Sequence, residues 1–235
     1  MFKSHLFTLM LVIAFVALLG GCGQNQKSSE EMKKSGTTGN ETTKKTLTDD
    51  EREKAKQQTI KNLKDAIKGE TTASKKYAEY SKKAKEEGLN SIAKMFEATS
   101  KSESIHAQNH ISALEQLGEK PDAVEPQFEV KSTKDNLMDA IKGETYEVTQ
   151  MYPAFLSVAE DGKVTIATIS FNYAMKTEER HKAMYENALD KLQNGKENTL
   201  STEYYVCPTC GNTYDTQPPN RCGISMTSKD RFIRI

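Results

Sequence analysis

Apolar and small residues recur at intervals of three and four along four long stretches of this chain of 235 residues. On a helix this spacing gathers the side chains on one face, so each stretch predicts a helix with one side turned to a core. The first stretch surrounds Glu70, and the others span about 92–117, 134–160 and 163–192. Four amphipathic helices of this length predict a four-helix bundle, which makes the fold class mainly α.

One ten-residue phrase occurs twice, at Asn62–Thr71 and at Asn136–Thr145, and the copies differ only at Lys64 and Met138. A repeat at an interval of 74 residues indicates a duplicated structural unit. Each copy is followed by a Glu-x-x-His motif that begins 33 or 34 residues after the glutamate of the phrase. The bundle is therefore predicted to consist of two similar helix pairs.

The acidic and histidine residues of the repeat lie on the predicted buried faces. Glu70 and Glu144 share the apolar stripe of their helices, and the two residues of each Glu-x-x-His motif lie one turn apart. A single glutamate on one helix and a Glu-x-x-His pair on the next, supplied twice, is the ligand set of a di-metal carboxylate site. Because an unpaired buried carboxylate is costly, such a group needs metal or protons. The predicted ligands are Glu70, Glu103, His106, Glu144, Glu178 and His181.

Two simpler interpretations concern the same residues. A plain bundle with Glu70 and Glu144 solvated near helix ends is the alternative for either half, and the agreement between the halves favours the metal site. His110 lies four residues after His106 on nearly the same face, but it has no counterpart in the second copy. We therefore interpret His110 as a core or bundle-end histidine rather than a ligand.

The two copies differ one turn after Glu144, where Glu147 stands in place of Ala73 of the first copy. A seventh ligand on one side makes the site asymmetric and gives one metal an alternative to a histidine. Pro153 has no N–H to donate to the carbonyl of Thr149, which predicts a kink or bulge of the third helix close to Glu147.

These motifs resemble those of the rubrerythrin family. The matching segments are Gly-Glu70-Thr-Thr-Ala, Glu103-x-x-His106, Gly-Glu144-Thr-Tyr-Glu147 with Met151-Tyr152-Pro153 after it, and Glu178-x-x-His181. The resemblance covers roughly Leu47 to the C-terminus. It implies a ferritin-like bundle with two non-haem irons. It also implies a peroxidase that reduces hydrogen peroxide to water in oxidative-stress defence, with both irons as the two-electron source.

The resemblance also implies roles for individual residues. Glu147 and His106 are expected to exchange at one iron as its oxidation state changes. The hydroxyls of Tyr77 and Tyr152 are expected to bond to ligand carboxylates, and bonds of this kind hold ligands in orientation. Family members commonly pair so that the mononuclear iron of one chain approaches the di-iron centre of another, so a homodimer is expected.

The C-terminal residues 203–235 contain Cys207-Pro-Thr-Cys210-Gly and Cys222-Gly-Ile-Ser225. Two knuckles at this spacing hold a tetrahedral metal through thiolates, in a domain too short to fold without it. The segment resembles the rubredoxin-like domain of the family, whose single iron relays electrons, but Ser225 replaces the fourth cysteine. A serine or water oxygen can complete the site, and this hard donor favours ferric iron and lowers the reduction potential. The alternative is a metal-free tail in which Cys207 and Cys210 form a disulfide or stay reduced.

The N-terminal residues 1–21 have a basic start, an apolar run from Leu6 to Leu19 and small residues directly before Cys22. This pattern looks like a bacterial lipoprotein signal with lipid attachment at Cys22, and an uncleaved anchor helix is the alternative. Residues 22–46 have almost no large apolar side chains, so they predict a flexible tether of roughly 25 to 30 Å. We therefore expect the protein at the cell membrane, lipid-anchored on the extracytoplasmic face.

Composition changes this picture little. The net charge is zero, and charged residues, 28% of the chain, are interleaved along the helices as on solvated faces. This balance gives no indication of nucleic-acid binding. The chain suits one bundle at 47–195 and a small module at 203–235. Two other functions stay open, a ferroxidase or iron-binding protein that uses oxygen and an anchored module without redox activity. The electron donor is not identified.

Overall fold

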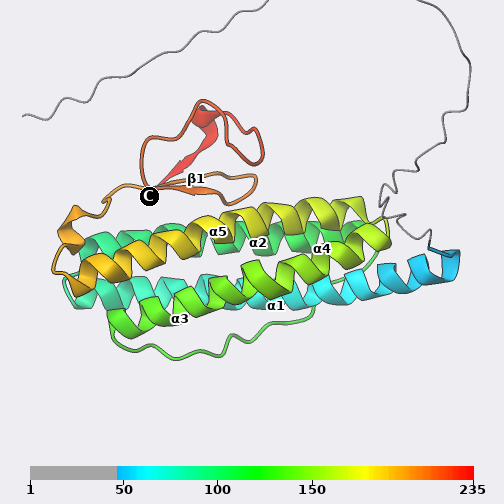
Figure 1. The fold of residues 1–235 in the computed structure, drawn as a ribbon, viewed down its shortest axis with the longest axis horizontal. Helices are drawn as coiled ribbons and strands as arrows, with labels where there is room; N and C mark the ends of the chain where they lie inside the picture. The colour runs from blue at the N-terminus through cyan, green and yellow to red at the C-terminus, as the bar shows by residue number, and fades with distance from the viewer. Residues whose placement is uncertain (1–46) are drawn as a thin grey trace, which may run out of the picture. The chain divides into compact units, whose positions relative to one another are not determined.

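A computed structural model of the chain describes residues 47–235, and four long helical segments make up most of this part (Figure 1). The first pair is α1 (Asp49–Glu86) and α2 (Asn90–Gln116). The second pair is α3 (Thr133–Tyr146), continued by α4 (Tyr152–Asp161), and α5 (Thr165–Gln193). The predicted four-helix bundle is confirmed. The expected lipoprotein signal, the lipid attachment expected at Cys22 and the expected tether all lie outside the described residues.

Side-chain caps mark the beginning of α1 and of α3. Thr48 accepts a hydrogen bond from the N–H of Glu51 at 3.2 Å, and the Glu51 carboxylate accepts one from the N–H of Thr48 at 2.8 Å, which is a capping box for α1. Ser132 caps α3 by accepting from the N–H of Asp135 at 3.2 Å. These caps satisfy backbone donors that the first turn of a helix leaves free.

The third helix is interrupted close to Glu147, as Pro153 predicts. Residues Glu147–Met151 form a π-helical turn, η1, in which the N–H of Tyr152 bonds to the carbonyl of Glu147. Pro153 then lies in the first turn of α4, where a missing N–H is tolerated. The bulge expected close to Glu147 is confirmed, and it divides the helix predicted over 134–160 into two helices joined by a π turn.

Two apolar clusters fill the bundle, one on each side of the predicted ligands. The first cluster contains Tyr77, Tyr80, Phe96, Leu137 and Tyr185. The second contains Ile60, Leu63, Leu114, Tyr152 and Phe171. Along each of the four helical segments the predicted ligands fall between residues of these two clusters. The two apolar cores therefore seal the centre of the bundle from both ends.

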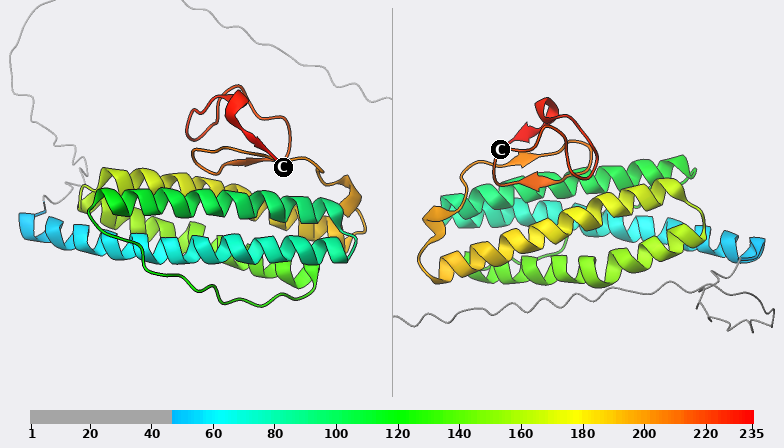
Figure 2. Two further views of the ribbon diagram at one scale, coloured as in Figure 1. Left: turned by 180° about the vertical axis from the view of Figure 1, so that it is seen from behind. Right: turned by 45° about the horizontal axis from the view of Figure 1, so that its top comes forward.

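The rest of the described chain lies outside this core. Residues 117–132 connect the two helix pairs and run lengthwise along the bundle (Figure 2). After the short helix η2 (Glu197–Thr199), a tail forms a three-stranded antiparallel sheet in the order β2-β1-β3 against α2 and α5. Its elements are β1 (Tyr205–Val206), β2 (Thr213–Tyr214), η3 (Lys229–Arg231) and β3 (Ile233–Arg234). No helix in the described part is long and apolar enough to cross a membrane.

Candidate metal centre

Six acidic and histidine side chains from α1, α2, α3 and α5 meet in the middle of the bundle. They form two groups, and within each group the candidate ligand atoms all lie within 4.8 Å of one another. The first group is Glu70, Glu103, His106 and Glu178, and the second is Glu103, Glu144, Glu178 and His181. Because Glu103 and Glu178 belong to both groups, the arrangement is that of two metal positions bridged by two carboxylates.

The distances support this bridging role. Glu178 places one oxygen 2.7 Å from Nδ1 of His106 and the other 2.7 Å from Nδ1 of His181. Glu103 reaches the same two nitrogens with its two oxygens, at 3.0 and 3.1 Å. Each glutamate therefore offers one oxygen to each half of the centre.

The donor atoms fit a pair of cations. The carboxylate oxygens of Glu103 and Glu178, one oxygen of Glu70 and Nδ1 of both histidines are buried and make no hydrogen bond within the described chain. Buried polar atoms without partners are costly, and here they all face the same space. Four carboxylates in the two groups carry four negative charges, which two divalent cations would balance. The residues therefore fit the two irons that the sequence predicts.

The second nitrogen of each histidine is held by the C-terminal tail. Nε2 of His106 lies 3.1 Å from the carbonyl oxygen of Cys210, and Nε2 of His181 lies 3.0 Å from Oγ1 of Thr213. A carbonyl only accepts, so Nε2 of His106 carries the proton and its Nδ1 keeps a lone pair for a metal.

Without cations, the centre has to hold protons. Burial and the charge of Glu178 raise the pKa of Glu144 well above its usual range, and burial raises the pKa of Glu70 to about 7. Burial alone would lower the pKa of His106, but the carboxylates of Glu178 and Glu70 outweigh it and raise that pKa. Metal ions and protons therefore compete for the same group.

Glu147 lies beside the two groups rather than in them. It is the first residue of the π turn η1 and is half-buried. Burial, followed by the charges of Glu70 and Glu144, raises its pKa well above the usual range. The structure therefore leaves Glu147 outside both ligand groups, where the charges of Glu70 and Glu144 still act on it.

Two tyrosines hold ligand carboxylates across the bundle. Tyr77, on the helix of Glu70, donates to Oε1 of Glu144 at 2.7 Å. Tyr152, which follows Glu144 in the chain, donates to Oε1 of Glu70. Both hydrogen bonds implied by the resemblance are present, and each connects one half of the repeat to the other.

His110 is buried, as the sequence analysis expects of a core histidine, and it is absent from both ligand groups. Its hydrogen bonds were not predicted. Nε2 lies 3.1 Å from the hydroxyl of Tyr152 and Nδ1 lies 2.7 Å from Oγ of Ser170. The sequence signal was only its position one turn after His106.

The predicted thiol ligands of the tail also come together. Cys207, Cys210 and Cys222 are buried free thiols that form one candidate ligand group. Their Sγ atoms lie close, with 3.5 Å between Cys210 and Cys222. Oγ of Ser225 lies 3.3 Å from Sγ of Cys207 and 2.8 Å from the hydroxyl of Thr227. Ser225 thus stands at the fourth position, with a hydrogen-bond partner of its own.

A close backbone approach joins the tail to the bundle. Gly211 has φ +78°, and a Cβ added there would lie 2.5 Å from Oγ of Ser102 and overlap the ring of His106. Its carbonyl accepts from Ser102 at 2.7 Å, and the carbonyl of Cys210 accepts from Thr177 at 3.2 Å. Only glycine allows both the backbone conformation and this contact. The thiol cluster of the tail therefore lies against the ligand histidines of the same chain.

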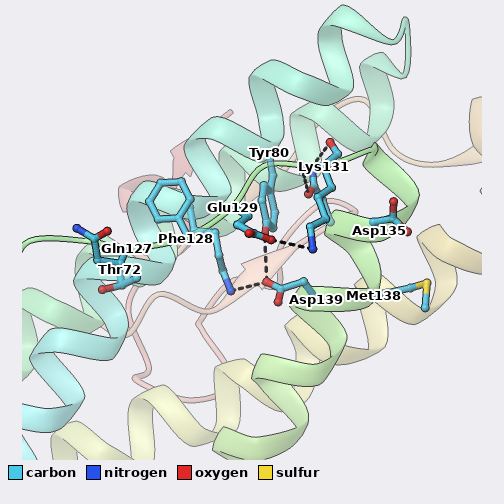
Figure 3. Close-up of a pocket in the computed structure, with 11 residues that line it drawn as sticks. Thr72, Tyr80, Gln127, Phe128, Glu129, Lys131, Asp135, Met138 and Asp139 are labelled. Carbon is cyan, nitrogen blue, oxygen red and sulfur yellow. Dashed lines mark hydrogen bonds and ion pairs between the residues drawn. The ribbon is translucent and has the colours of Figure 1, made fainter.

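A surface pocket of about 390 Å³ between α1, α3 and the connection 117–132 has a different character (Figure 3). Most of its charged residues form ion pairs with each other. Lys76 lies 2.7 Å from Asp139, Tyr80 donates to the same carboxylate at 2.9 Å, and Lys131 lies 2.8 Å from Glu129. None of the residues that line it belongs to either ligand group. The chemistry of the chain is therefore better sought in the centre of the bundle.

Comparison with known proteins agrees with the resemblance to the rubrerythrin family. The family model described as Rubrerythrin matches residues 61–189. The chain is 32% identical to Rubrerythrin-2 of Clostridium acetobutylicum, over 72% of this chain and 92% of the relative. It is 33% identical to Nigerythrin of Nitratidesulfovibrio vulgaris, over 74% of this chain and 85% of the relative.

Solved structures agree with these matches. A structure of nigerythrin in a mixed-valence state superposes with a TM-score of 0.69 at 31% identity, covering 75% of this chain and 86% of that one. A bacterioferritin from Desulfovibrio desulfuricans superposes with a TM-score of 0.58 at 20% identity, covering 63% of this chain and 86% of that one. The second likeness shows only that the fold is shared.

Proposed function

The chain belongs to the rubrerythrin family, and from this we propose that it is a peroxidase that reduces hydrogen peroxide to water. The observation that supports this most directly is the set of buried carboxylate oxygens and histidine nitrogens that make no hydrogen bond within the described chain and lie between the two apolar cores. Two ferrous ions bound there would supply the two electrons that, with two protons, convert one peroxide into two waters.

The residues around the centre would have distinct tasks in this reaction. Tyr77 and Tyr152 hold the terminal carboxylates, while Glu103 and Glu178 span the two metal positions. Glu147 would exchange with His106 at one iron, and the influence of the Glu70 and Glu144 charges on its carboxylate supports this role. The two apolar cores exclude bulk water from the centre.

We also propose that the tail is rubredoxin-like and binds one iron through Cys207, Cys210, Cys222 and Ser225. Support comes from Cys210, whose backbone carbonyl contacts Nε2 of His106. Electrons from an external donor would then cross one hydrogen bond between a residue of the tail site and a ligand of the bundle site. The donor itself is not identified.

The test is an anaerobic titration of the reduced, iron-loaded protein, with the iron counted beforehand. A peroxidase should consume one peroxide for every two ferrous ions that are oxidised and react slowly with oxygen, whereas a ferroxidase should consume oxygen preferentially. Wild-type protein that binds fewer than two metals in the bundle would overturn the assignment in favour of a module without redox activity. Glu178→Ala is the control, because it should bind no di-iron centre.

Membrane attachment and pairing remain proposals from the sequence. The small residues before Cys22 support a lipid anchor on the extracytoplasmic face, and the family resemblance supports a homodimer. Labelling with radioactive palmitate tests the first, since Cys22→Ser should lose both the label and the membrane fraction. Sedimentation of the mature chain tests the second, and a monomer at micromolar concentration would argue against pairing.

A further inference from the structure

The two tyrosines that donate to ligand carboxylates, Tyr77 and Tyr152, differ in their other hydrogen-bond partners. The hydroxyl of Tyr152 contacts Glu70 on one side and Nε2 of His110 on the other. In the described part of the chain the hydroxyl of Tyr77 makes a hydrogen bond to Glu144 alone. The two halves of the repeat therefore differ in the residues that contact the ligands: only one ligand-holding tyrosine has a histidine as a second hydrogen-bond partner.

The repeat explains why only one half has this support. Applying the spacing that relates His106 to His181 places Tyr185 opposite His110. The hydroxyl of Tyr185 donates to Oγ1 of Thr99 at 2.6 Å and not to Tyr77, whose ring lies 5.5 Å away in an edge-on arrangement. The second half thus has a core hydroxyl where the first half has a histidine.

The chain of contacts behind Tyr152 has a defined direction. Tyr152 donates to Glu70, so its oxygen is free to accept from Nε2–H of His110. A neutral imidazole with its proton on Nε2 has a lone pair on Nδ1, which accepts from the hydroxyl of Ser170 at 2.7 Å. Every donor and acceptor from Ser170 to Glu70 is then matched.

The surroundings keep His110 in this state. Its side chain is fully buried, and burial disfavours the charged form of an imidazole. The ring also packs against Phe171, with centroids 5.3 Å apart. The packing fixes the orientation of the ring, and the hydrogen-bond partners on its two nitrogens select the tautomer.

We propose that His110 and Ser170 are positioning residues for the hydroxyl of Tyr152. Through that hydroxyl they hold Glu70 in place. This inference rests on the proposed function, because the proposed exchange of Glu147 and His106 needs a neighbouring carboxylate that does not move. Among the described residues, Glu144 has a single hydroxyl, that of Tyr77, and no histidine behind it.

The tautomer can be measured without any reaction. In zinc-loaded protein labelled with ¹⁵N-histidine, the signals of His110, identified by their loss in His110→Leu, should show a proton on Nε2 and none on Nδ1. Ser170→Ala should weaken this preference. A proton on Nδ1, or protons on both nitrogens, would overturn the chain of contacts whatever the protein does with peroxide.

Metal retention and reactivity test the consequence. In reduced iron-loaded His110→Leu, one of the two irons should be lost to a chelator faster than the other, and peroxide reduction should slow by roughly 10- to 100-fold. Ser170→Ala should act in the same direction with a smaller effect and serves if His110→Leu folds poorly. His110→Gln, which retains a donor, should recover much of the rate.

The matched control is Tyr185→Phe, which removes a buried hydroxyl from the equivalent position of the other half. It should leave both the iron release and the peroxide rate unchanged. If His110→Leu behaves like this control while the wild type consumes peroxide, the inference fails and the proposed function stands. If the wild type consumes no peroxide, the proposed function fails, and the tautomer and iron release still decide the positioning role.

Discussion

The bundle and the C-terminal tail each bring together side chains that could bind a metal. The two sites differ in whether the oxygen atoms of these side chains have hydrogen-bond partners in the protein. In the bundle, both oxygens of Glu103 and of Glu178 face the centre with no hydrogen-bond partner. In the tail, Ser225 is hydrogen-bonded to Thr227, which in turn donates to Thr209 at 2.7 Å. The bundle therefore depends on cations or protons, whereas the oxygen of the tail site is already satisfied.

The difference follows from how each site is built. The bundle site takes ligands from four long helical segments that two apolar cores hold in place. The tail site takes them from two short turns in a small sheet. A substitution in the bundle should therefore change stability and metal binding together, and one in the tail should change mainly the local site and its contact with the bundle.

The largest expected effect is that of Glu178→Ala. This carboxylate lies 2.7 Å from each ligand histidine, so its loss removes a bridge and leaves both without their main partner. Breaking a buried pair of this kind costs about 3–5 kcal/mol, and the bundle should lose its metals as well. Thermal unfolding with metal analysis measures both. Glu179→Ala, at the exposed neighbouring position, should change neither, and a stable two-metal Glu178→Ala protein would contradict the bridging role.

The sequence predicts the bundle site far better than its surroundings. All six ligands of the two groups follow from helical spacing and the repeat, because these side chains share one face. Spacing puts His110 one turn after His106, but it gives no signal for the partner Ser170, which is 60 residues away. The contact between tail and bundle uses the carbonyls of Cys210 and Gly211, and backbone groups carry no residue-specific pattern.

Gly211→Ala should disrupt the contact between the tail and the bundle, and it should have the second largest effect on stability. A left-handed residue with a side chain costs roughly 1–2 kcal/mol, and the added Cβ would also overlap the ring of His106. We expect the tail to lose protection from hydrogen exchange along β1 and β2, and electron transfer into the bundle to slow. Two alanine controls sharpen the test. Gly195→Ala has the same strain in open space, and Gly223→Ala meets only an ordinary contact with Tyr214. Equal effects from all three would exclude a specific contact.

Ser225→Cys tests whether the tail is a metal site in its own right. If Cys207, Cys210 and Cys222 bind iron with an oxygen donor, the oxidised wild type should absorb at higher energy than an all-cysteine centre. The variant should then turn red and gain a higher reduction potential, because a soft thiolate stabilises ferrous iron better than a hard oxygen. Visible spectra and potentiometry measure this, with Ser225→Ala as the control. A wild type without tail iron beside an iron-loaded variant would end the relay proposal.

Glu147→Ala should have the smallest effect on stability. The direction of the change is informative, because the variant should stabilise the metal-free protein. The variant copies Ala73 of the first half, so both metals should stay while peroxide turnover falls. Burial and the nearby carboxylates raise the pKa of Glu147 in the folded state, so the unfolded chain gives up its proton more readily. This residue therefore weakens the metal-free fold as the pH rises above the ordinary glutamate value of 4.5.

Metal-free Glu147→Ala should consequently unfold at a higher temperature than the wild type at neutral pH, and the difference should vanish in acid. Glu147→Gln should behave in the same way, because it also removes the ionisable group. Urea unfolding of the three metal-free proteins between acid and neutral pH measures the effect. A stability difference that does not change with pH would mean that Glu147 acts through packing, and its closeness to Glu70 would then have no electrostatic consequence.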